Sequence, residues 1–412
     1  MPEFLRLTPP AEALRRWLEA FPAKPPVARE RVPTESALDR VLAETVTAPH
    51  ALPSFPRSNV DGYALRAEDT FGASASLPAY LRVVGEVPMG GSADRPVGPG
   101  EALLVHTGGM IPEGASAVVM LEDTQSIPPS EVEIYRAAAS GQNVIRAGED
   151  VQPGDVLLEA GIRLRPQELG GLLALGLTTV EVFARPRVAI LSTGDEVVPP
   201  QAEPRPGQVR DINSYTLAAV VTRAGGEPRL YGIIPDRKEL LEETARRAHA
   251  ESDLVIVTAG SSASARDMSA DVLAGLGTPG VLVHGLAIKP GKPTILGVAG
   301  KVPLVGLPGN PVSALVIAWL TVVPAVRRLG GAKPEAPAGR IRARLTANIP
   351  SETGREDYVP VRLAATPDGW SADPVFGKSN LIFSLVRADG LVRIPADATG
   401  LSAGGLVDVE RF

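Results

Sequence analysis

The sequence contains no cysteine, and this absence excludes several kinds of chemistry at once. Without thiols the chain cannot form disulfides, bind zinc or iron–sulfur clusters through thiolates, or use a cysteine nucleophile. Histidine is scarce, and the four residues show neither metal-ligand spacing nor an accompanying nucleophile elbow: His50, His106, His249 and His284. Walker A and G-x-G-x-x-G motifs are also missing. Carboxylates, lysines, hydroxyls and backbone turns remain as candidates for the chemistry.

An excess of positive charge and a membrane-length apolar run are lacking too. The formal net charge is −6 and no basic face stands out, which argues against nucleic acid as the main partner. Residues 1–21 are amphipathic and carry acids, unlike a signal peptide. The most apolar run, Pro311 to Val326, is shorter than the roughly 20 residues that span a bilayer. We therefore expect a buried helix at this run, no membrane contact and a cytoplasmic protein.

The length and hydrophobic content predict several globular domains. With 412 residues, 44% of them hydrophobic, the chain is too long for one ordinary core, and about two to four domains are expected. Helical patterns at residues 11–21 and 34–44 precede short apolar runs broken by glycine and proline. These runs, within residues 51–133, predict a small β domain. A helical run returns at residues 166–177, which suggests that the β domain is inserted into another domain.

From Arg187 onward, strands and helices alternate with short turns. This rhythm predicts a mostly parallel sheet covered by helices on both faces, a doubly wound α/β domain. In such a sheet ligands bind beyond the carboxyl ends of the strands. After a Gly/Ala/Pro linker, short strands return and predict a small β-barrel. The expected domains are an N-terminal mixed domain (1–48 and 140–183), a β-rich inserted domain (49–139), the α/β domain (184–330) and the C-terminal barrel (338–412).

The segment AIKPGKPTILG, Ala287 to Gly297, places two lysines in a stiff turn. Pro290 and Pro293 fix the backbone φ angle, and Gly291 allows conformations that other residues rarely adopt. Lysine normally points into water, so a solvated surface turn explains the segment about equally well by itself. Because the turn follows an apparent strand, its position favours contact with an anionic ligand.

Other polar turns carry side chains suited to phosphate or Mg²⁺. Ser192 to Glu196 combines hydroxyls with two carboxylates, and Ser261 to Asp267 is rich in serine before a helix. Leu307 to Ala314 is a stiff proline turn before an apolar helix. Elsewhere, SNVDGYALR contains Asp61 and RAGED ends at Asp150. Each of these turns also fits an ordinary cap or turn. Together they predict a phosphorylated anionic ligand held by lysines and backbone turns, with carboxylates for Mg²⁺.

Motifs in a fixed order resemble the molybdopterin molybdotransferase family, which includes MoeA and the E domain of gephyrin. They are SNVDGYA, TGGMIPEGASAVVMLED, GQNVIRAGED, STGDE, AIKPGKP and LPGNPVSA, and they extend over nearly the whole chain. The resemblance implies insertion of molybdenum from molybdate into adenylylated molybdopterin, with Mg²⁺ and with release of AMP. It also implies an elongated homodimer of four-domain subunits whose α/β domain resembles the molybdopterin adenylyltransferase MogA.

The same resemblance implies roles for individual residues. Lys289 and Lys292 match family lysines that meet the metal oxyanion and the pterin phosphates. With these lysines, Asp61 and Glu196 are the expected catalytic residues. The implied Mg²⁺ ligands are Asp61, Asp150 and Glu196. The implied substrate contacts are Thr107, Ser192, Thr193, Gly194, Asp211, Gly260, Ser262, Asp267, Pro308, Pro311, Arg355 and Ser379.

One turn departs from the family pattern. Ala259 to Ser264 replaces a glycine-rich turn, and a positive φ at Ser264 would cost roughly 1 kcal/mol or more. The change indicates either a neutral variation or a paralogue with altered pterin or metal preference.

The resemblance leaves alternative functions open. One is a non-catalytic scaffold or molybdopterin-binding protein, which the retained carboxylates and lysines disfavour. Another is insertion of tungsten, since molybdate and tungstate are tetrahedral dianions of nearly equal size. The expected partners are a second copy of the chain and, transiently, molybdopterin adenylyltransferase and apo-molybdoenzymes. In the dimer, Asp61 is expected to serve the site built by the other subunit's α/β domain.

Overall fold

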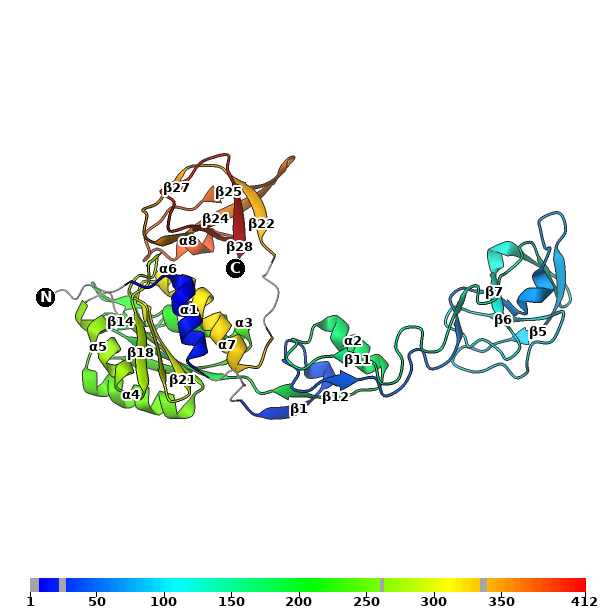
Figure 1. Cartoon of the computed structure of the whole chain (residues 1–412), viewed down its shortest axis with the longest axis horizontal. Coiled ribbons are helices and arrows are strands. Elements are labelled where there is room, and N and C mark those ends of the chain that lie inside the picture. The colour runs from blue at the N-terminus through cyan, green and yellow to red at the C-terminus, as the bar shows by residue number, and fades with distance from the viewer. Residues whose placement is uncertain (1–6, 22–26, 260–262, 334–338) are drawn as a thin grey trace. The chain divides into compact units, whose positions relative to one another are not determined.

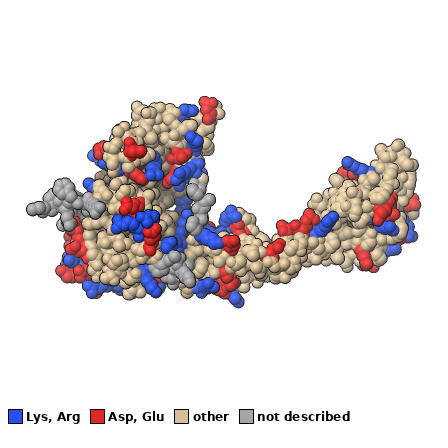
Figure 2. Space-filling view, viewed as in Figure 1, with Lys and Arg blue, Asp and Glu red and all other residues tan. Residues whose placement is uncertain are grey.

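The structure is a computed structural model that describes residues 7–21, 27–259, 263–333 and 339–412 (Figure 1). The chain folds into two compact units, each assembled from separate stretches of sequence. Unit 1 comprises Met1–Ala43, Gly161–Arg165 and Val180–Phe412, and unit 2 comprises Glu44–Ala160 and Pro166–Thr179. Each unit has its own sheets and its own hydrophobic core. Over the face drawn in Figure 2, acidic and basic side chains are both spread across the surface.

The main sheet of unit 1 is mostly parallel. Its strands, in spatial order, are β16 (Glu227–Ile234), β13 (Arg187–Thr193), β17 (Leu254–Ala259), β21 (Val302–Pro308), β20 (Ile295–Ala299) and β18 (Pro279–His284). β20 runs against both of its neighbours, and the other strands share one direction. Along β13, Val188 and Ile190 enter one core while Ala189 and Leu191 enter another. Since neighbouring residues of a strand face opposite sides, both faces of this sheet are buried.

Helices cover both faces, which confirms the predicted doubly wound α/β fold. One face packs against α1 (Pro10–Glu19), α3 (Asn213–Ala224), α6 (Pro311–Ile317), the π-helical turn η4 (Ala318–Val322) and α7 (Val323–Leu329). The other face packs against α4 (Lys238–Glu251) and α5 (Ala263–Ala274). The continuous helix Pro311–Leu329 is long and apolar enough to cross a membrane by length and composition. It is nevertheless a core helix, as predicted, because 61% of its apolar window is buried within the protein.

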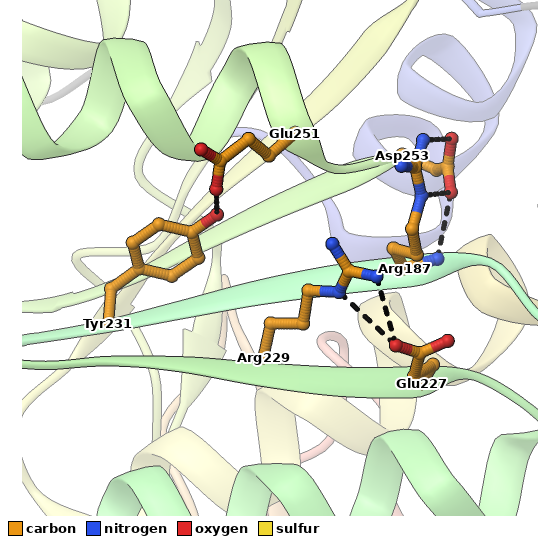
Figure 3. Close-up of polar contacts among 6 residues, drawn as sticks. All are labelled: Arg187, Glu227, Arg229, Tyr231, Glu251 and Asp253. Atoms are coloured by element: carbon orange, nitrogen blue, oxygen red, sulfur yellow. Dashed lines mark hydrogen bonds and ion pairs between the residues drawn. The ribbon is translucent and has the colours of Figure 1, made fainter.

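Polar contacts lie along β16 and at the amino end of β13 (Figure 3). Arg187 at the start of β13 binds Asp253, with 2.8 Å from its backbone nitrogen and 3.2 Å from Nε to Oδ2. Glu227 at the start of β16 accepts from Arg229 at 3.1 Å. The Tyr231 hydroxyl donates to Glu251 at 2.6 Å. These contacts lie among the sheet and α4, away from the turns at the carboxyl ends of the strands.

The C-terminal part of unit 1 is the predicted barrel. Its strands are β22 (Ile341–Leu345), β24 (Glu356–Thr366), β25 (Gly369–Pro374), β26 (Gly390–Ile394) and β28 (Leu406–Arg411). They close into a ring because β24 pairs with both β25 and β26. Val361, Val392 and Val409 fill its interior. A short strand from the α/β part, β19 (Ile288–Lys289), adds to the same sheet by pairing with β24.

Unit 2 is built around a second sheet. Its strands, in spatial order, are β7 (Ala117–Met120), β4 (Gly62–Leu65), β6 (Glu101–Val105), β5 (Ala79–Glu86), β9 (Glu131–Ile134) and β8 (Thr124–Ile127). Tyr63 and Leu65 enter one core and Ala64 enters another, so this sheet is also covered on both faces. The helix α2 (Pro166–Ala174) belongs to this unit.

The helix predicted at residues 34–44 is wrong. Only a 3₁₀ turn, Thr34–Ser36, forms there. Asp39 follows with a φ angle of 63°, in the left-handed region that ends a right-handed helix. The next residues pair with a distant segment, because Leu42 donates its backbone N–H to Ile162 at 2.9 Å. Tertiary pairing therefore overrides the local helical pattern.

Helix α1 belongs to the α/β core through the buried side chains of Ala13 and Trp17. Trp17 is 0% exposed and donates its indole N–H to the Gly297 carbonyl in β20 at 2.7 Å. Its ring also meets Phe21 edge to face, with centroids 5.5 Å apart. This anchor joins residues that are 280 positions apart in the sequence.

We expect Trp17→Phe to lower the free energy of unfolding by about 2 kcal/mol, because it removes a buried hydrogen bond and part of the packing. Trp370→Phe is the matched control, since Trp370 is 45% exposed and its replacement should change stability by less than about 0.5 kcal/mol. Denaturant unfolding of both variants measures the difference. Equal losses in the two would show that the Trp17 anchor contributes nothing specific.

Candidate functional site

The two lysines of the predicted site lie on a turn that the fold holds rigidly. The turn follows β18, which runs in the same direction as β21, so it lies at the carboxyl edge of the sheet. The Lys292 carbonyl accepts from the Leu286 N–H at 2.8 Å, and the Gly291 carbonyl accepts from the buried Thr294 hydroxyl at 2.7 Å. The side chains of Lys289 and Lys292 are exposed. Two cations thus project from a backbone that has little freedom left.

Gly291 is required in this turn for two reasons. Its φ angle is +113°, a conformation that other residues rarely adopt. A Cβ atom there would lie 2.3 Å from Cδ1 of Ile317, which is completely buried in α6. The turn therefore rests directly on the core helix.

Lys289 and Arg355 meet at a buried acid that sequence reasoning missed. The Arg355 Nε donates to Asp357 Oδ1 at 3.0 Å, and the Lys289 Nζ lies 4.0 Å from Asp357 Oδ2. Asp357 is 3% exposed. Lys289 and Arg355, both predicted as oxyanion contacts, are thus brought to the same carboxylate. The motif GREDY gave no signal of this role, because the partner lysine is distant in sequence.

The proline turn and Ser379 are also brought together. Val312, at the start of α6, donates its N–H to the Ser379 carbonyl at 3.1 Å, and Asn310 Nδ2 donates to the Ser379 hydroxyl at 3.1 Å. From α3, Asn213 Nδ2 donates to the Gly309 carbonyl at 2.8 Å. The predicted Pro308, Pro311 and Ser379 therefore share one location. Asn213 and Asn310 are additional residues that the sequence did not single out.

The turn Ser192–Glu196 is part of a group of carboxylates. Asp195 accepts from the backbone N–H of Asp236 at 3.1 Å. Burial, together with the negative charges of Asp195 and Glu196, raises the pKa of the Asp236 carboxyl above its ordinary value. The Asp236 Oδ1 atom is buried and has no hydrogen-bond partner within the part of the chain that the structure describes. Asp236 was missed because IIPDRKEL reads as an ordinary helix start.

The hydroxyls of the same turn are less accessible than predicted substrate contacts need to be. Ser192 and Thr193 are buried at the end of β13, and Thr193 donates to the Thr258 carbonyl at 3.2 Å. Gly194, with a φ angle of 140°, makes the bend that follows. The backbone of this turn, more than its hydroxyls, is therefore presented at the sheet edge.

Asp211 is engaged in a structural contact at the start of α3. Its Oδ2 accepts from the Ser214 hydroxyl at 2.6 Å and its Oδ1 from the Ser214 N–H at 3.1 Å, the pattern of a helix N-cap. Asp267 is exposed on α5. Its substrate role, like that of Asp211, stays a prediction.

Gly260 and Ser262 lie outside the described residues. Ser264 lies in the first turn of the right-handed helix α5, where φ is negative. The strain that a positive φ at Ser264 would cause is therefore absent.

In unit 2, Asp61 before β4 and Thr107 after β6, each predicted separately as a site residue, lie in hydrogen-bonding contact. Asp61 Oδ1 accepts from the Thr107 N–H at 2.7 Å and from its hydroxyl at 3.1 Å. These hydrogen bonds, the backbone one first, hold the pKa of the Asp61 carboxyl below its ordinary value. His106 lies beside them, with Nδ1 3.7 Å from Asp61 and Nε2 2.9 Å from Glu86. Asp150 is exposed on the loop after β10 (Val144–Ile145).

Comparison with known proteins shows which family the chain belongs to. Three family models match along the chain: the MoeA N-terminal region (domain I and II) at residues 8–176, a probable molybdopterin binding domain at 189–328, and the MoeA C-terminal region (domain IV) at 342–412. A molybdopterin molybdenumtransferase of Haemophilus influenzae is 32% identical over 97% of this chain and 98% of its own. One from Nostoc is 34% identical over 90% of this chain and 85% of its own. The chain belongs to the MoeA family.

A solved MoeA structure supports the same assignment. The molybdopterin biosynthesis moeA protein of Pyrococcus horikoshii superposes with a TM-score of 0.85 and 35% identity, covering 99% of this chain and 100% of its own. The resemblance drawn from the sequence motifs is thereby confirmed, as is the predicted fold class. Within this chain, Asp61, Thr107 and Asp150 fall in the MoeA N-terminal region. The lysine turn falls in the molybdopterin-binding region, and Arg355 and Ser379 fall in the C-terminal region.

We expect Gly291→Ala to lower the free energy of unfolding by about 3 kcal/mol, because it combines backbone strain with overpacking against Ile317. Gly300→Ala is the control: Gly300 also has a positive φ, +60°, but nothing lies within 4 Å of an added Cβ. Strain alone should cost about 1 kcal/mol there. Denaturant unfolding compares the two, and similar losses would show that the contact with α6 does not constrain the turn.

Proposed function

We propose that the protein is a molybdopterin molybdenumtransferase that inserts molybdenum from molybdate into adenylylated molybdopterin, releases AMP and works in the cytoplasm. Membership of the MoeA family gives it a role in molybdenum cofactor biosynthesis. The observation that carries the specific proposal is the arrangement of Lys289 and Arg355 around one buried acid. Two cations on a rigid backbone suit a tetrahedral dianion, since little conformational entropy is left to lose on binding.

The neighbouring groups have complementary roles in this proposal. Lys289 and Arg355 bind the oxyanion, and Ser379 orients it beside the proline turn. Lys292, on the same turn as Lys289, neutralises the phosphates of the pterin substrate. The positive end of the helix that begins with α6 lies at the same edge and favours negative charge there. These groups all belong to unit 1.

The proposal includes Mg²⁺, and the carboxylates near the end of β13 fit such an ion. Glu196 and Asp236 offer hard oxygen ligands, and a buried oxygen of Asp236 lacks a hydrogen-bond partner among the described residues. No group of three or more ligands spaced for a metal occurs in the described ranges. Mg²⁺ commonly needs only one or two carboxylates and completes its shell with water and substrate phosphates. The ion would neutralise charge on the departing phosphate. The roles of Asp61 and Asp150 as ligands stay predictions.

We expect Lys289→Ala and Lys292→Ala each to reduce AMP release by about 100-fold or more, because each removes a charge that faces the anionic substrates. The assay uses the purified protein, adenylylated molybdopterin, Mg²⁺ and either molybdate or tungstate, and the relative rates decide the metal. Lys301→Ala is the control, since Lys301 lies in the turn between β20 and β21 at the opposite edge of the sheet.

Lys292→Ala and Lys301→Ala should keep the stability of the wild type within about 0.5 kcal/mol, as exposed side chains usually do. Lys289→Ala should stay folded but lose more stability, because it removes a charge beside the buried Asp357. Full activity of both Lys289→Ala and Lys292→Ala would refute the ligand-contact role. Loss of folding in them would show instead that the turn is structural. A wild-type protein that releases no AMP with either oxyanion would favour the scaffold alternative.

We further propose a homodimer in which Asp61 of one subunit serves the site of the other. The proposal also includes transient contact with a molybdopterin adenylyltransferase, which makes the substrate, and with apo-molybdoenzymes, which receive the product. The support is the family membership and the position of Asp61 in a sequence region separate from the lysine turn.

Mixed dimers test this sharing. When inactive Asp61→Asn and Lys289→Ala proteins are unfolded and refolded together, about half of the dimers should be mixed, and each should contain one intact site. AMP release should then recover to roughly a quarter of the wild-type rate. Mass measurement confirms that mixed dimers form. Their presence without any recovery would mean that Asp61 serves its own subunit.

A further inference from the structure

Asp357 is a buried acid in an unusual position, directly beneath two exposed or half-exposed cations. It opposes Lys289 in the register of β24 and β19, so the backbone fixes the distance between the two residues. The adjacent Glu356 N–H donates to the Ala287 carbonyl at 2.9 Å, which secures the same pairing. Each carboxylate oxygen faces a different cation, Oδ1 facing Arg355 and Oδ2 facing Lys289.

Burial makes these contacts costly to lose. A charged carboxylate that is 3% exposed loses hydration on folding, and charged or hydrogen-bonding partners must offset that loss. Arg355 also contacts Glu352 at 3.0 Å, but the Glu352 side chain is 77% exposed, and such surface pairs contribute little. Asp357, rather than Glu352, therefore sets the position of the Arg355 guanidinium.

The two contacts with Asp357 leave hydrogen-bond donors of Lys289 and Arg355 free. The 4.0 Å between Lys289 Nζ and Asp357 Oδ2 is too long for a hydrogen bond, so attraction restrains the ammonium without occupying its donors. The Lys289 side chain is 62% exposed, and Arg355 uses Nε for Asp357 and Nη1 for Glu352, which leaves Nη2. Donors of both cations remain for a ligand above the acid.

We infer that Asp357 is a positioning residue that holds Lys289 and Arg355 as one binding unit for a tetrahedral metal oxyanion. This inference rests on the proposed function and adds to it the residue that sets the spacing of the two cations. Lys289 comes from the α/β part of unit 1 and Arg355 from the barrel. Asp357 therefore contacts one cation from each part with a single carboxylate.

The direction in which Asp357→Asn changes oxyanion affinity distinguishes a positioning role from a passive one. Asp357 carries a negative charge near a site for a dianion. If it were only a neighbour, Asp357→Asn would remove a repulsion and tighten oxyanion binding. If it positions the cations, the same substitution releases both and weakens binding. The two roles thus predict changes in opposite directions.

The experiment measures the Kd of molybdate and of tungstate for the purified full-length protein by titration calorimetry. We expect Asp357→Asn to raise the Kd about tenfold or more, within the range of ordinary coupling between sites. Asp357→Glu, which keeps the charge, should recover part of the affinity. Asp373→Asn is the matched control and should leave the Kd unchanged, since it removes another barrel acid that pairs with an arginine, Arg362, at 3.8 Å. Unchanged or tighter binding by Asp357→Asn overturns the inference.

A double-mutant cycle covers the case in which Asp357→Asn does not fold. Lys289→Gln and Arg355→Gln are measured singly and together in the chain that retains Asp357. One binding unit predicts that the double variant loses less affinity than the product of the two single losses. If the affinity loss of the double variant equals the product of the two single losses, the inference is overturned. If wild-type protein binds neither oxyanion, the proposed function falls together with it, whereas wild-type binding with a failed cycle removes only the role of Asp357.

Discussion

The pairing of β19 with β24 is the interaction on which the candidate site depends. Two residues of the lysine turn, Ile288 and Lys289, join the sheet of the barrel at Glu356 and Asp357. Because backbone hydrogen bonds fix this register, the cations from the α/β part and from the barrel have a defined spacing. Without the pairing, the lysine turn would be a loop of the α/β part alone, with no access to Arg355.

The site also shows how rigidity is distributed around exposed charges. The lysines themselves are exposed, yet the backbone beneath them rests on Ile317 of the core helix and on the buried Thr294. Asn213 and Ser379 hold the neighbouring proline turn from two sides. The residues that contact a ligand are thus few, and the residues that order them come from α3, α6 and the barrel.

The sequence predicted the features that local patterns encode. Alternation of strands and helices gave the doubly wound fold, and the prolines around Lys289 and Lys292 identified a stiff cationic turn. Contacts between distant residues were not predictable in the same way. Trp17 meets Gly297 across 280 positions, and Asn213 meets Gly309 across 96. The helix expected at residues 34–44 failed for the same reason, since its backbone pairs with Ile162 and Leu164.

Because β19 of the α/β part pairs with β24, the barrel is not an independent module. The molybdopterin-binding region ends at residue 328 and the MoeA C-terminal region begins at residue 342, so the barrel looks like a separate module in the sequence. A barrel cut at that division would lose β19, leaving Glu356 and Asp357 of β24 without their strand partner and Asp357 without the Lys289 charge. Recombination that exchanges only the C-terminal region would therefore have to supply a compatible turn in the recipient. The two regions are expected to be inherited together.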